Sequence, residues 1–539
     1  MTQWNYADMW EIVAAAVPDR PAQVQGDRVV SWRDFDRRAN GLARHFLDVG
    51  LTHQAKVAAY LYNGPEYLET YYAAFKAGLA PVNTNYRYVT DELMYLFDNA
   101  DAEAVVFHAS FADTVEQIRE RLPRVKAWVA VAEPGHPVPA FAADYDALVA
   151  QDHARVIAPW GRSSDDLLIL YTGGTTGMPK GVMWRQEDLF HVLGGGGNLM
   201  IEVPPFETAA DAGPRALADY GGVMIAAAPM MHGTSQFTAM SALIRGETVA
   251  CLPSQRFNAL ELWNESARLK ATTVVIVGMA FAAPMLEALE ADPTRWDLSN
   301  ITRLGSSGTV WSMENKLGLL KHMPQCIIFD SLGSSEAVGL GVSFTGLGAP
   351  VETAKFTVGP NSAVFTEDGR RVAPGSGERG QLAVSGHLPM GYYKDKEKTD
   401  RTFKVYEGKR WSIPGDFATV EVDGTMTLLG RGSQVINTGG EKVFPEEVEE
   451  AIKRYPGVRD AAVVGVPDAR FGEKICAVVD MGAGAAPDLA TISEHVRHTI
   501  AGYKAPRELV LAPIQRAPNG KLDYQAMKAL ALQRLGLAT

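Results

Sequence analysis

The sequence predicts an α/β fold, with a large amino-terminal domain of helix-covered β-sheets and a small, mobile α+β carboxy-terminal domain. Its 539 residues exceed what one hydrophobic core usually holds, so more than one domain is expected. Residues 1–165 alternate strand-like and helix-like patterns, which is typical of a largely parallel sheet covered by helices. The polar, glycine-rich run 432–442 has the composition of an interdomain linker. We therefore place the large domain at residues 1–432 and the small domain at residues 433–539.

Capping residues and apolar runs predict the elements of the large domain. Ser31 is a capping residue for a helix that continues at helical spacing through Asn40. A second helix is expected at residues 67–77, ending at Gly78. Short apolar runs predict strands at residues 56–61, 80–83 and 104–107.

The small domain is predicted in the same way. A helix begins at Pro445, where proline suits the first turn and the acids that follow suit the positive end of the helix dipole. A second helix is expected at residues 489–500. Apolar runs predict strands at residues 461–464, 475–479 and 509–511.

Composition and charge exclude several classes of protein. Apolar residues make up 47% of the chain and charged residues 21%, as in ordinary globular proteins. The net charge of −12 argues against nucleic acid or an anionic membrane as the main partner, because both attract basic surfaces. No apolar run of about 18 residues predicts a membrane span, and the first ten residues do not read as a signal peptide. Cys251, Cys326 and Cys476 lie far apart and are expected to be reduced and buried, as in a cytoplasmic protein.

The strongest motif is YTGGTTGMPKG at residues 171–181, between an apolar strand-like run and a second strand-like run, 182–184. Glycines let the backbone turn sharply and bring its amides close to a ligand. The threonine hydroxyls add donors and Lys180 adds a positive charge, so the loop suits a polyphosphate. The motif is not the P-loop of NTPases, because there the lysine directly precedes Ser or Thr at the start of a helix. The phosphate-binding candidates in this loop are Thr172, Gly173, Gly174, Thr175, Thr176 and Lys180.

Two segments with several polar residues, 304–308 and 330–336, each follow an apolar stretch. Ligands gather at the carboxyl ends of parallel strands, so both loops could face one cleft. Asp416 and Arg431 lie fifteen residues apart; a carboxylate can accept from two ribose hydroxyls, and an arginine can reach ribose or phosphate. The sequence APNGK predicts a tight turn that presents Lys521.

Two other segments, 229–237 and 194–197, contain candidate residues for binding the substrate. His232 follows an apolar strand, and no acid occurs between Pro229 and Phe237. The family resemblance given below places this segment beside the substrate carboxylate, and it implies a substrate without an ammonium group, because a buried ammonium needs a counter-charge. The four glycines 194–197 indicate a plain loop, with a close backbone approach to a bulky ligand as the alternative.

The string at 171–181 resembles the phosphate loop of adenylate-forming enzymes, the superfamily of acyl-CoA synthetases, luciferases and peptide-synthetase adenylation domains. The motifs quoted above follow in the family's order over nearly the whole chain, and the segment 81–89 matches a stretch to which we assign a structural role. The resemblance implies that Lys521 is catalytic in adenylation and that Glu336, with Thr175, holds Mg²⁺. Leu332 departs from the family, which carries an aromatic residue against adenine at this place.

The resemblance also implies contacts with ATP, with CoA and at a domain hinge. Gly305, Ser306 and Ser307 would contact adenine through their backbone, and Asp330 would accept from its amino group. The hinge falls on Ser433, where the family usually has Asp or Lys. The remaining implied contacts are Ser331, Gly333, Ser335, Asp416 and Arg431 with ATP, and Gly439, Gly440 and Lys442 with CoA.

The sequence resembles one branch of this superfamily more closely than the others. YTGGTTGMPKGVMWR, GYYKDKEKT, INTGGEKVFPEEVE and AGYKAPR look like the actinobacterial-type ligases that activate steroid side-chain carboxylates and related bulky acids. We expect an acyl pocket whose glycine leaves volume and whose methionine adapts to irregular apolar shapes. Its predicted residues are Met231, His232, Gly233, Phe237 and Gly278, with the glycines 194–197 as a further candidate wall.

These observations predict an ATP-dependent carboxylate–CoA ligase, which forms an acyl-adenylate and then an acyl-CoA thioester. Its substrates would be ATP, CoA and a small-molecule carboxylic acid, either bulky or long-chain, and we allow for a homodimer. The alternatives are a ligase that loads a carrier protein, a luciferase-like monooxygenase and a catalytically inactive nucleotide-binding protein. The motifs cannot separate CoA from a carrier protein, because both present a phosphopantetheine thiol.

Overall fold

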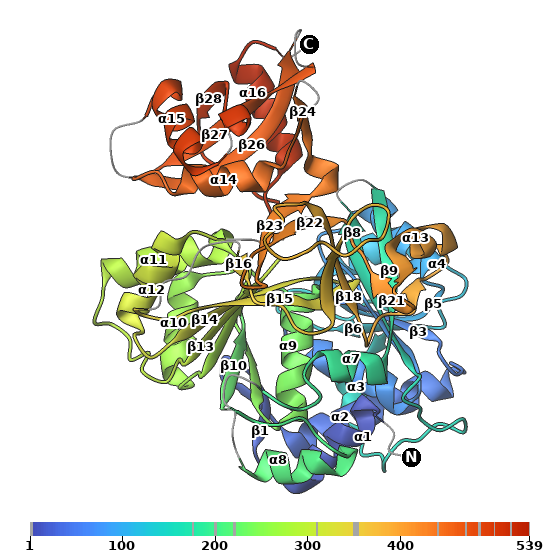
Figure 1. Ribbon diagram of the computed structural model, residues 1–539. Helices are drawn as coiled ribbons and strands as arrows, with labels where there is room; N and C mark the ends of the chain where they lie inside the picture. Colours follow the sequence, from blue (N-terminus) through green and yellow to red (C-terminus); the bar gives the residue numbers. More distant parts are fainter. Residues whose placement is uncertain are drawn as a thin grey trace. The chain divides into compact units, whose positions relative to one another are not determined.

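The computed structural model divides into two compact units, each a mixture of helices and β-sheets, in agreement with the predicted α/β class (Figure 1). The first unit comprises Met1–Ile276, Thr294–Leu304 and Gly386–Phe403; the second comprises Val277–Pro293, Gly305–Ser385 and Lys404–Thr539. The predicted boundary at 432–433 lies within the second unit and stays a prediction. The structure describes residues 4–174, 177–198, 202–218, 222–308, 311–348, 355–438, 441–468, 472–482, 487–500, 502–517 and 520–537.

The sheet that carries the phosphate motif lies in the first unit, with strand order β19-β9-β8-β4-β3-β5-β6-β7. Its strands are β3 Lys56–Tyr60, β4 Ala80–Asn83, β5 Ala102–His108, β6 Ala127–Val131, β7 Ala143–Asp144, β8 Leu167–Gly174, β9 Gly177–Arg185 and β19 Gly391–Tyr392. Neighbours from β8 to β7 run parallel, whereas β9 is antiparallel to both β8 and β19. The prediction of a largely parallel sheet is therefore confirmed.

A second run of strands in the first unit has the order β12-β10-β11-β1-β2. Only β2 is antiparallel to its neighbour in this run. The strands are β1 Pro21–Gln25, β2 Arg28–Ser31, β10 Val223–Ala226, β11 Thr248–Cys251 and β12 Thr273–Ile276.

The helices of the first unit begin and end largely where capping chemistry predicts. The Ser31 side chain accepts a hydrogen bond from the Asp34 backbone N–H at the start of α2, and α3 ends two residues before Gly78. The helices are α1 Tyr6–Ala16, α2 Trp32–Asp48, α3 Pro65–Lys76, α4 Thr90–Asn99, α5 Ala112–Arg119, α6 Tyr145–Val149, α7 Gln186–Val192, α8 Ala212–Ala218, α9 Gly233–Ile244, α10 Ala259–Arg268 and α13 Lys396–Thr402.

The second unit contains three groups of strands. The first has the order β15-β14-β13, with β14 and β15 forming an antiparallel hairpin. The second has the order β16-β23-β22-β18-β21-β20, with β17 beside β18. The elements are α11 Met279–Ala291, β13 Arg303–Ser307, α12 Met313–His322, β14 Ile327–Ser334, β15 Ala337–Thr345, β16 Lys355–Phe356, β17 Ser362–Phe365, β18 Gly380–Ser385, β20 Phe403–Tyr406, β21 Lys409–Ser412, β22 Asp416–Val420 and β23 Met426–Arg431.

The last hundred residues form a group of their own, drawn in orange and red in Figure 1. Their sheet has the order β25-β24-β27-β26, with β28 parallel to β27. The elements are β24 Ile436–Thr438, β25 Glu441–Val443, α14 Pro445–Lys453, β26 Val458–Asp468, β27 Gly472–Met481, α15 Leu489–Thr499, β28 Glu508–Leu511 and α16 Tyr524–Arg534. All five elements predicted for the small domain are confirmed. Strands β24 and β25, in the run interpreted as a linker, and helix α16 were not predicted.

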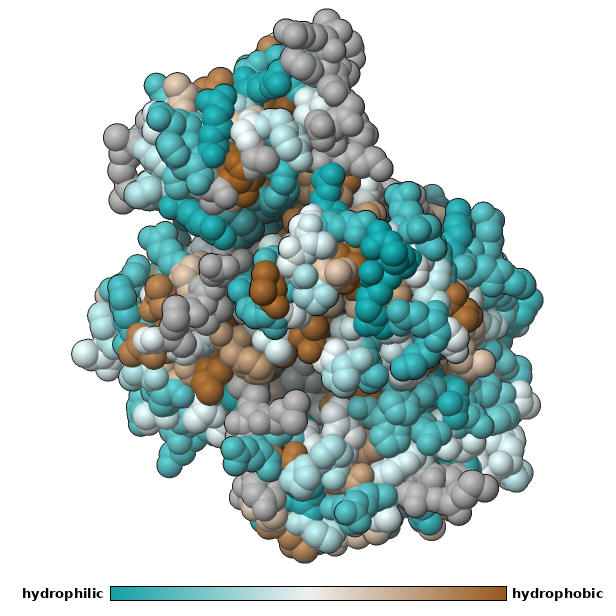
Figure 2. Space-filling model, viewed as in Figure 1, coloured by the Kyte–Doolittle hydropathy of each residue, from teal (hydrophilic) through white to brown (hydrophobic). Residues whose placement is uncertain are grey.

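The surface agrees with the composition. On the face shown in Figure 2, hydrophilic residues predominate and hydrophobic residues occur in small, scattered groups. The three cysteines are buried and form no disulfide, as expected. In the part of the chain that the structure describes, no helix has both the length and the apolar character needed to span a membrane.

A cluster of charges is buried in the first unit. The Lys76 side chain is fully buried, and its ammonium lies 2.6 Å from Glu11 and 2.8 Å from Asp36. Arg162 donates to Glu11 with both terminal nitrogens, at 2.8 and 2.9 Å. Burial alone would raise the pKa of Glu11, but the hydrogen bond from Arg162 and the charge of Lys76 lower it to about 2.

Replacing Lys76 with methionine should lower the free energy of unfolding by about 3 kcal/mol or more, because it leaves two carboxylates without their buried partner. The measurement is the urea concentration at the midpoint of unfolding, determined at a series of pH values. In the parent, stabilisation by Glu11 should be present above its usual pKa of 4.5 and be lost as the pH falls toward 2. The control, Lys126→Met, breaks a surface pair with Glu103 and should change stability by less than about 1 kcal/mol. Equal effects of the two substitutions would contradict the prediction.

Candidate functional site

The phosphate motif forms a β-hairpin. Strands β8 and β9 pair through Thr172 opposite Lys180 and through Gly174 opposite Gly177, with Gly173 between them on β8. A strand follows the motif, as predicted, and not the helix of an NTPase P-loop. Thr175 and Thr176 lie outside the described residues. Cross-strand pairing therefore sets the hydroxyl of Thr172 and the ammonium of Lys180 on opposing positions of one hairpin.

One buried amide anchors this hairpin. The Asn83 side chain is 3% exposed. Its oxygen accepts from the Tyr171 N–H at 2.6 Å, and its nitrogen donates to the carbonyls of Tyr171 at 2.9 Å and of Met231 at 2.7 Å. The sequence predicts a structural role for the segment 81–89, which contains Asn83, and these hydrogen bonds agree with that role.

Lys180 has a partner that the sequence did not reveal. Its ammonium forms an ion pair with Asp395, whose side chain also accepts from the Lys398 N–H at 2.8 Å and so caps α13. The hydrogen bond from Lys180 holds the pKa of Asp395 below its usual value. The two residues are 215 positions apart, so no local pattern could have indicated the pair.

Four of the predicted acyl-pocket residues surround the start of α9. Met231 is buried, His232 precedes the helix as its N-cap residue, and Gly233 is its first residue. A methyl group built on Gly233 would lie 3.3 Å from the ring of Phe237, so a larger residue would crowd that ring. Asn63 fixes the chain before them: its oxygen accepts from the Met230 N–H at 2.7 Å, a role that sequence reasoning missed.

The glycine run 194–197 packs against the chain itself. Gly194, Gly195 and Gly196 have positive φ angles. A methyl group on Gly196 would lie 2.7 Å from the ring of Phe206, and one on Gly197 would lie 2.8 Å from the Pro205 nitrogen. The plain-loop interpretation accounts for these glycines, since the close approach is to neighbouring residues of the same chain.

In the second unit, two neighbouring strands hold the predicted adenine contacts. Gly305, Ser306 and Ser307 lie on β13, beside β14. A methyl group on Gly305 would clash with the Phe329 ring, so only glycine fits there. The Ser306 hydroxyl accepts from the Gly278 N–H at 3.0 Å, which joins a predicted nucleotide contact to a predicted acyl-pocket residue.

Asp330 is held by two buried residues that sequence reasoning missed. Its carboxylate accepts from the Trp311 indole N–H and from the Lys316 ammonium, the latter at 2.5 Å. Lys316 is 3% exposed, and its ammonium lies 5.4 Å from the Trp311 ring centroid. A carboxylate has about four acceptor positions, so these bonds orient Asp330 and leave acceptor capacity for an adenine amino group.

Glu336 lies in the turn between β14 and β15. Ser331 and Gly333 belong to β14, so the predicted loop is a strand, and Ser335 lies with Glu336 in the turn. The Glu336 carbonyl accepts from the Ser412 hydroxyl at 2.7 Å, which holds the turn. Within the described residues, no three His, Cys, Asp or Glu side chains gather to form a metal cage.

The predicted ribose pair is close in space. Asp416 begins β22 and Arg431 ends β23, and the two residues are direct partners across these antiparallel strands. Gly430, next to Arg431, has a φ of 116°, which favours glycine. Antiparallel pairing thus places the two backbone positions directly opposite each other despite the fifteen-residue separation.

Backbone hydrogen bonds link Ala517, Gly520 and Lys521 in the predicted turn, of which Pro518 and Asn519 lie outside the described residues. The Ala517 N–H donates to the Lys521 carbonyl at 2.7 Å, and the Gly520 N–H donates to the Ala517 carbonyl at 2.8 Å. A methyl group on Gly308 would lie 3.8 Å from Lys521 Cε, so the lysine stem is close to the end of β13. The lysine itself is exposed.

The predicted hinge and CoA contacts are less completely described. Ser433 lies in a short 3₁₀ turn, Gly432–Gln434, and Lys442 lies on β25. Gly439 and Gly440 fall outside the described residues.

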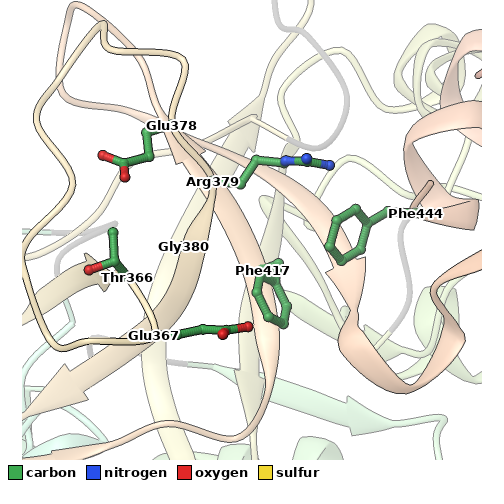
Figure 3. Close-up of a pocket in the computed structure, with 7 residues that line it drawn as sticks. All are labelled: Thr366, Glu367, Glu378, Arg379, Gly380, Phe417 and Phe444. Carbon is green, nitrogen blue, oxygen red and sulfur yellow. The ribbon is translucent and has the colours of Figure 1, made fainter. Parts of the chain in front are cut away.

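Figure 3 shows a pocket of 230 Å³ in the second unit. Phe417 and Phe444 lie side by side in it, with ring centroids 5.3 Å apart, and the Arg379 guanidinium extends toward Phe444 at 5.9 Å. Phe417 directly follows Asp416 in the chain. The pocket is lined by Thr366, Glu367, Glu378, Arg379, Gly380, Phe417 and Phe444.

Comparison with known proteins covers almost the whole chain. The family described as AMP-binding enzyme matches residues 10–393, and the AMP-binding enzyme C-terminal domain matches residues 447–521. A medium/long-chain-fatty-acid–CoA/3-oxocholest-4-en-26-oate–CoA ligase of Mycobacterium marinum is 40% identical over 97% of this chain and 96% of its own. A 3-oxocholest-4-en-26-oate–CoA ligase of Rhodococcus rhodochrous is 41% identical over 97% and 95%.

A solved structure shows the same fold. The anthranilate CoA ligase AuaEII, in complex with anthranoyl-AMP, superposes with a TM-score of 0.83 at 19% identity, covering 100% of this chain and 99% of that one. Together with the two matching family regions and the full-length relatives, this fold similarity leads to one conclusion: the chain belongs to the AMP-binding enzyme family.

Proposed function

We propose that this protein is an AMP-forming acid–thiol ligase that activates a carboxylic acid with ATP and transfers the acyl group to CoA. The observation that carries the proposal is the similarity, at 40–41% identity over nearly the full length, to relatives named as CoA ligases. The phosphate hairpin, the cross-strand Asp416–Arg431 pair and the lysine-bearing turn at 517–521 support it.

In the first step, the substrate carboxylate attacks the α-phosphorus of ATP and pyrophosphate leaves. Lys180 and the backbone amides of the hairpin would bind the phosphates, and Lys521 would stabilise the charge that develops in the transition state. Asp416 and Arg431 would hold the ribose, and Asp330 would accept from the adenine amino group. Trp311 and Lys316 support the last role by fixing the carboxylate.

In the second step, the CoA thiol attacks the acyl carbon and AMP leaves. The small domain, 433–539, would rotate about Ser433 between the steps and withdraw Lys521. Gly439, Gly440 and Lys442 would then contact CoA. The glycine-rich composition of 432–442 supports a boundary that allows such a movement.

Magnesium fits the residues present. Glu336 offers one carboxylate in a half-buried turn, and Thr175 would offer a hydroxyl. The absence of an all-protein cage among the described residues agrees with an ion that takes oxygen ligands from phosphates, water and one or two side chains. When bound, Mg²⁺ would neutralise phosphate charge.

The acyl group should be apolar and bulky or long. Met231, His232, Gly233, Phe237 and Gly278 would form the pocket. None of these side chains carries a fixed charge, and two relatives act by name on a steroid acid. The glycines 194–197 are outside the proposed pocket wall, because they pack on Phe206 and Pro205.

The direct test is pyrophosphate release with a panel of carboxylic acids, in the presence and absence of free CoA. The proposal expects acid-dependent pyrophosphate and AMP, together with an acyl-CoA product when CoA is present. Acid-dependent release without thioester formation on free CoA would point to a carrier protein as acceptor. No release with any acid would contradict the proposed function.

Replacing Lys521 with alanine should slow adenylation by about 10²–10³-fold, because one preorganised charge is lost from the first transition state. Thioester formation from a pre-made acyl-adenylate should largely survive. The rates of adenylation and of thioester formation are measured separately. The control is Lys528→Ala, because Lys528 lies in the same terminal segment as Lys521 and pairs with Glu473. Equal losses in the two half-reactions would contradict a step-specific role for Lys521.

Among acids, we expect a higher kcat/KM for a steroid side-chain acid or a diterpenoid acid than for palmitate. A wide pocket packs a straight chain poorly, although each well-buried methylene still contributes about 0.8 kcal/mol. Discrimination by apolar fit is modest, roughly 10–200-fold, so medium and long fatty acids should keep some activity. A clear preference for a straight-chain acid under the same conditions would refute the bulky substrate and leave the ligase reaction intact.

A further inference from the structure

The ion pair between Lys180 and Asp395 joins the phosphate hairpin to a segment that the proposed mechanism does not use. The two side chains are 39% and 26% exposed, so the pair lies at the edge of the protein, within reach of a ligand from solvent. One oxygen of Asp395, Oδ2, accepts from Lys180, while the other, Oδ1, accepts from the Lys398 N–H at 2.8 Å. The carboxylate therefore has two separate tasks, one for each oxygen.

The backbone that presents Asp395 is tied directly to the hairpin. Strand β19 pairs with β9 through Gly391 opposite Met183 and Tyr392 opposite Val182. The pairing is extended by the Tyr393 N–H, which donates to the Gly181 carbonyl at 2.8 Å. Gly181 is the neighbour of Lys180 on β9, and Asp395 follows two residues after Tyr393, so the strand pairing holds the two partners of the ion pair close together.

The chain then turns through an unusual conformation. Lys394 has a φ of 55°, in the left-handed region that a lysine rarely adopts. Its ammonium lies 2.8 Å from Asp101, which anchors the turn. Immediately afterwards, Asp395 caps α13, and the Thr399 hydroxyl donates to the Asp395 carbonyl at 2.8 Å. Strand pairing, turn and cap together fix where the carboxylate lies.

We propose that Asp395 is a positioning residue, which holds the Lys180 ammonium at the phosphate hairpin in readiness for the phosphates of ATP. An ammonium has three N–H donors, so Lys180 can keep its bond to Asp395 and still donate to phosphate oxygens. A free lysine would lose rotamer freedom on binding a phosphate, whereas a lysine held by Asp395 has already lost much of it. This role rests on one part of the proposed function, namely that the hairpin binds ATP.

The charge of Asp395 does not argue against this role. An isolated carboxylate beside the hairpin would repel phosphates, but here it is met by the Lys180 ammonium and by the Lys398 N–H. The hydrogen bond from Lys180 lowers the pKa of Asp395, so its carboxylate stays charged at neutral pH.

The test uses variants that keep the helix cap. Asparagine and serine both cap helices well, so Asp395→Asn and Asp395→Ser remove the ion pair while preserving a capping oxygen. The matched control is Asp144→Asn, because Asp144 caps α6 in the same way and has exposed hydrogen bonds to Asp146 and Ala147. A double-mutant cycle with Lys180→Met then isolates what Asp395 does through Lys180.

The first readout is the dissociation constant for MgATP, measured by calorimetry on the full-length protein without an acid. We expect Asp395→Asn and Asp395→Ser to weaken binding about three- to tenfold and Asp144→Asn to leave it unchanged. In the Lys180→Met background, the further change should be less than about twofold. Unchanged or tighter binding in both Asp395 variants would overturn the proposal, and so would an equal loss in the Lys180→Met background.

A second readout separates this inference from the proposed function. If the parent binds MgATP with the expected coupling but forms no adenylate from any carboxylic acid, the ligase reaction is wrong and the positioning role stands. If the parent forms acyl-CoA and the Asp395 variants keep the parent's KM for ATP, the ligase reaction stands and the positioning role is wrong. The thermal midpoints of Asp395→Asn and the parent should agree within a few degrees, since a shift without a change in ATP binding would indicate a purely structural role.

Discussion

The arrangement of the first unit's site residues depends on one buried side chain, the amide of Asn83. An amide has one acceptor oxygen and two donor hydrogens, and Asn83 uses all three groups, on the Tyr171 N–H, the Tyr171 carbonyl and the Met231 carbonyl. Aspartate could not donate, and an apolar residue would leave buried backbone groups unpaired, which costs about 1–3 kcal/mol for each group. The strand that leads into the phosphate motif and the chain that leads into α9 are thus held by the same side chain.

Much of the fold could be predicted because the signals that specify it are local. Ser31 caps α2, Pro445 begins α14, and the apolar runs at 56–61 and 475–479 became β3 and part of β27. The motif at 171–181 was expected to bind phosphate as a loop, yet most of it belongs to the paired strands β8 and β9. Glycine has a low propensity for strands. The pairing of β8 with β9 therefore depends on the apolar residues that flank the motif and set the register.

The site was predictable where a known motif names a residue, and unpredictable where a partner comes from another part of the chain. Asp416 and Arg431 were paired from their spacing and the family's motifs, and the structure places them opposite each other on antiparallel strands. Trp311, Lys316 and Asp395 could not be found in this way. Each acts on a predicted residue through a contact that only the folded chain creates, and a buried lysine or a cap aspartate looks like any other charge in the sequence.

Glycine-rich stretches show why composition alone misleads about room for a ligand. Glycine is required wherever another group approaches the backbone closely, and that group can belong to a ligand or to the protein. At Gly196 and Gly305 the group is an aromatic ring of the same chain, Phe206 and Phe329 respectively. The space that a missing side chain leaves is therefore already filled at both places. The acyl pocket proposed here is therefore defined by the apolar, uncharged residues around the start of α9, such as Met231 and Phe237, and not by the number of glycines.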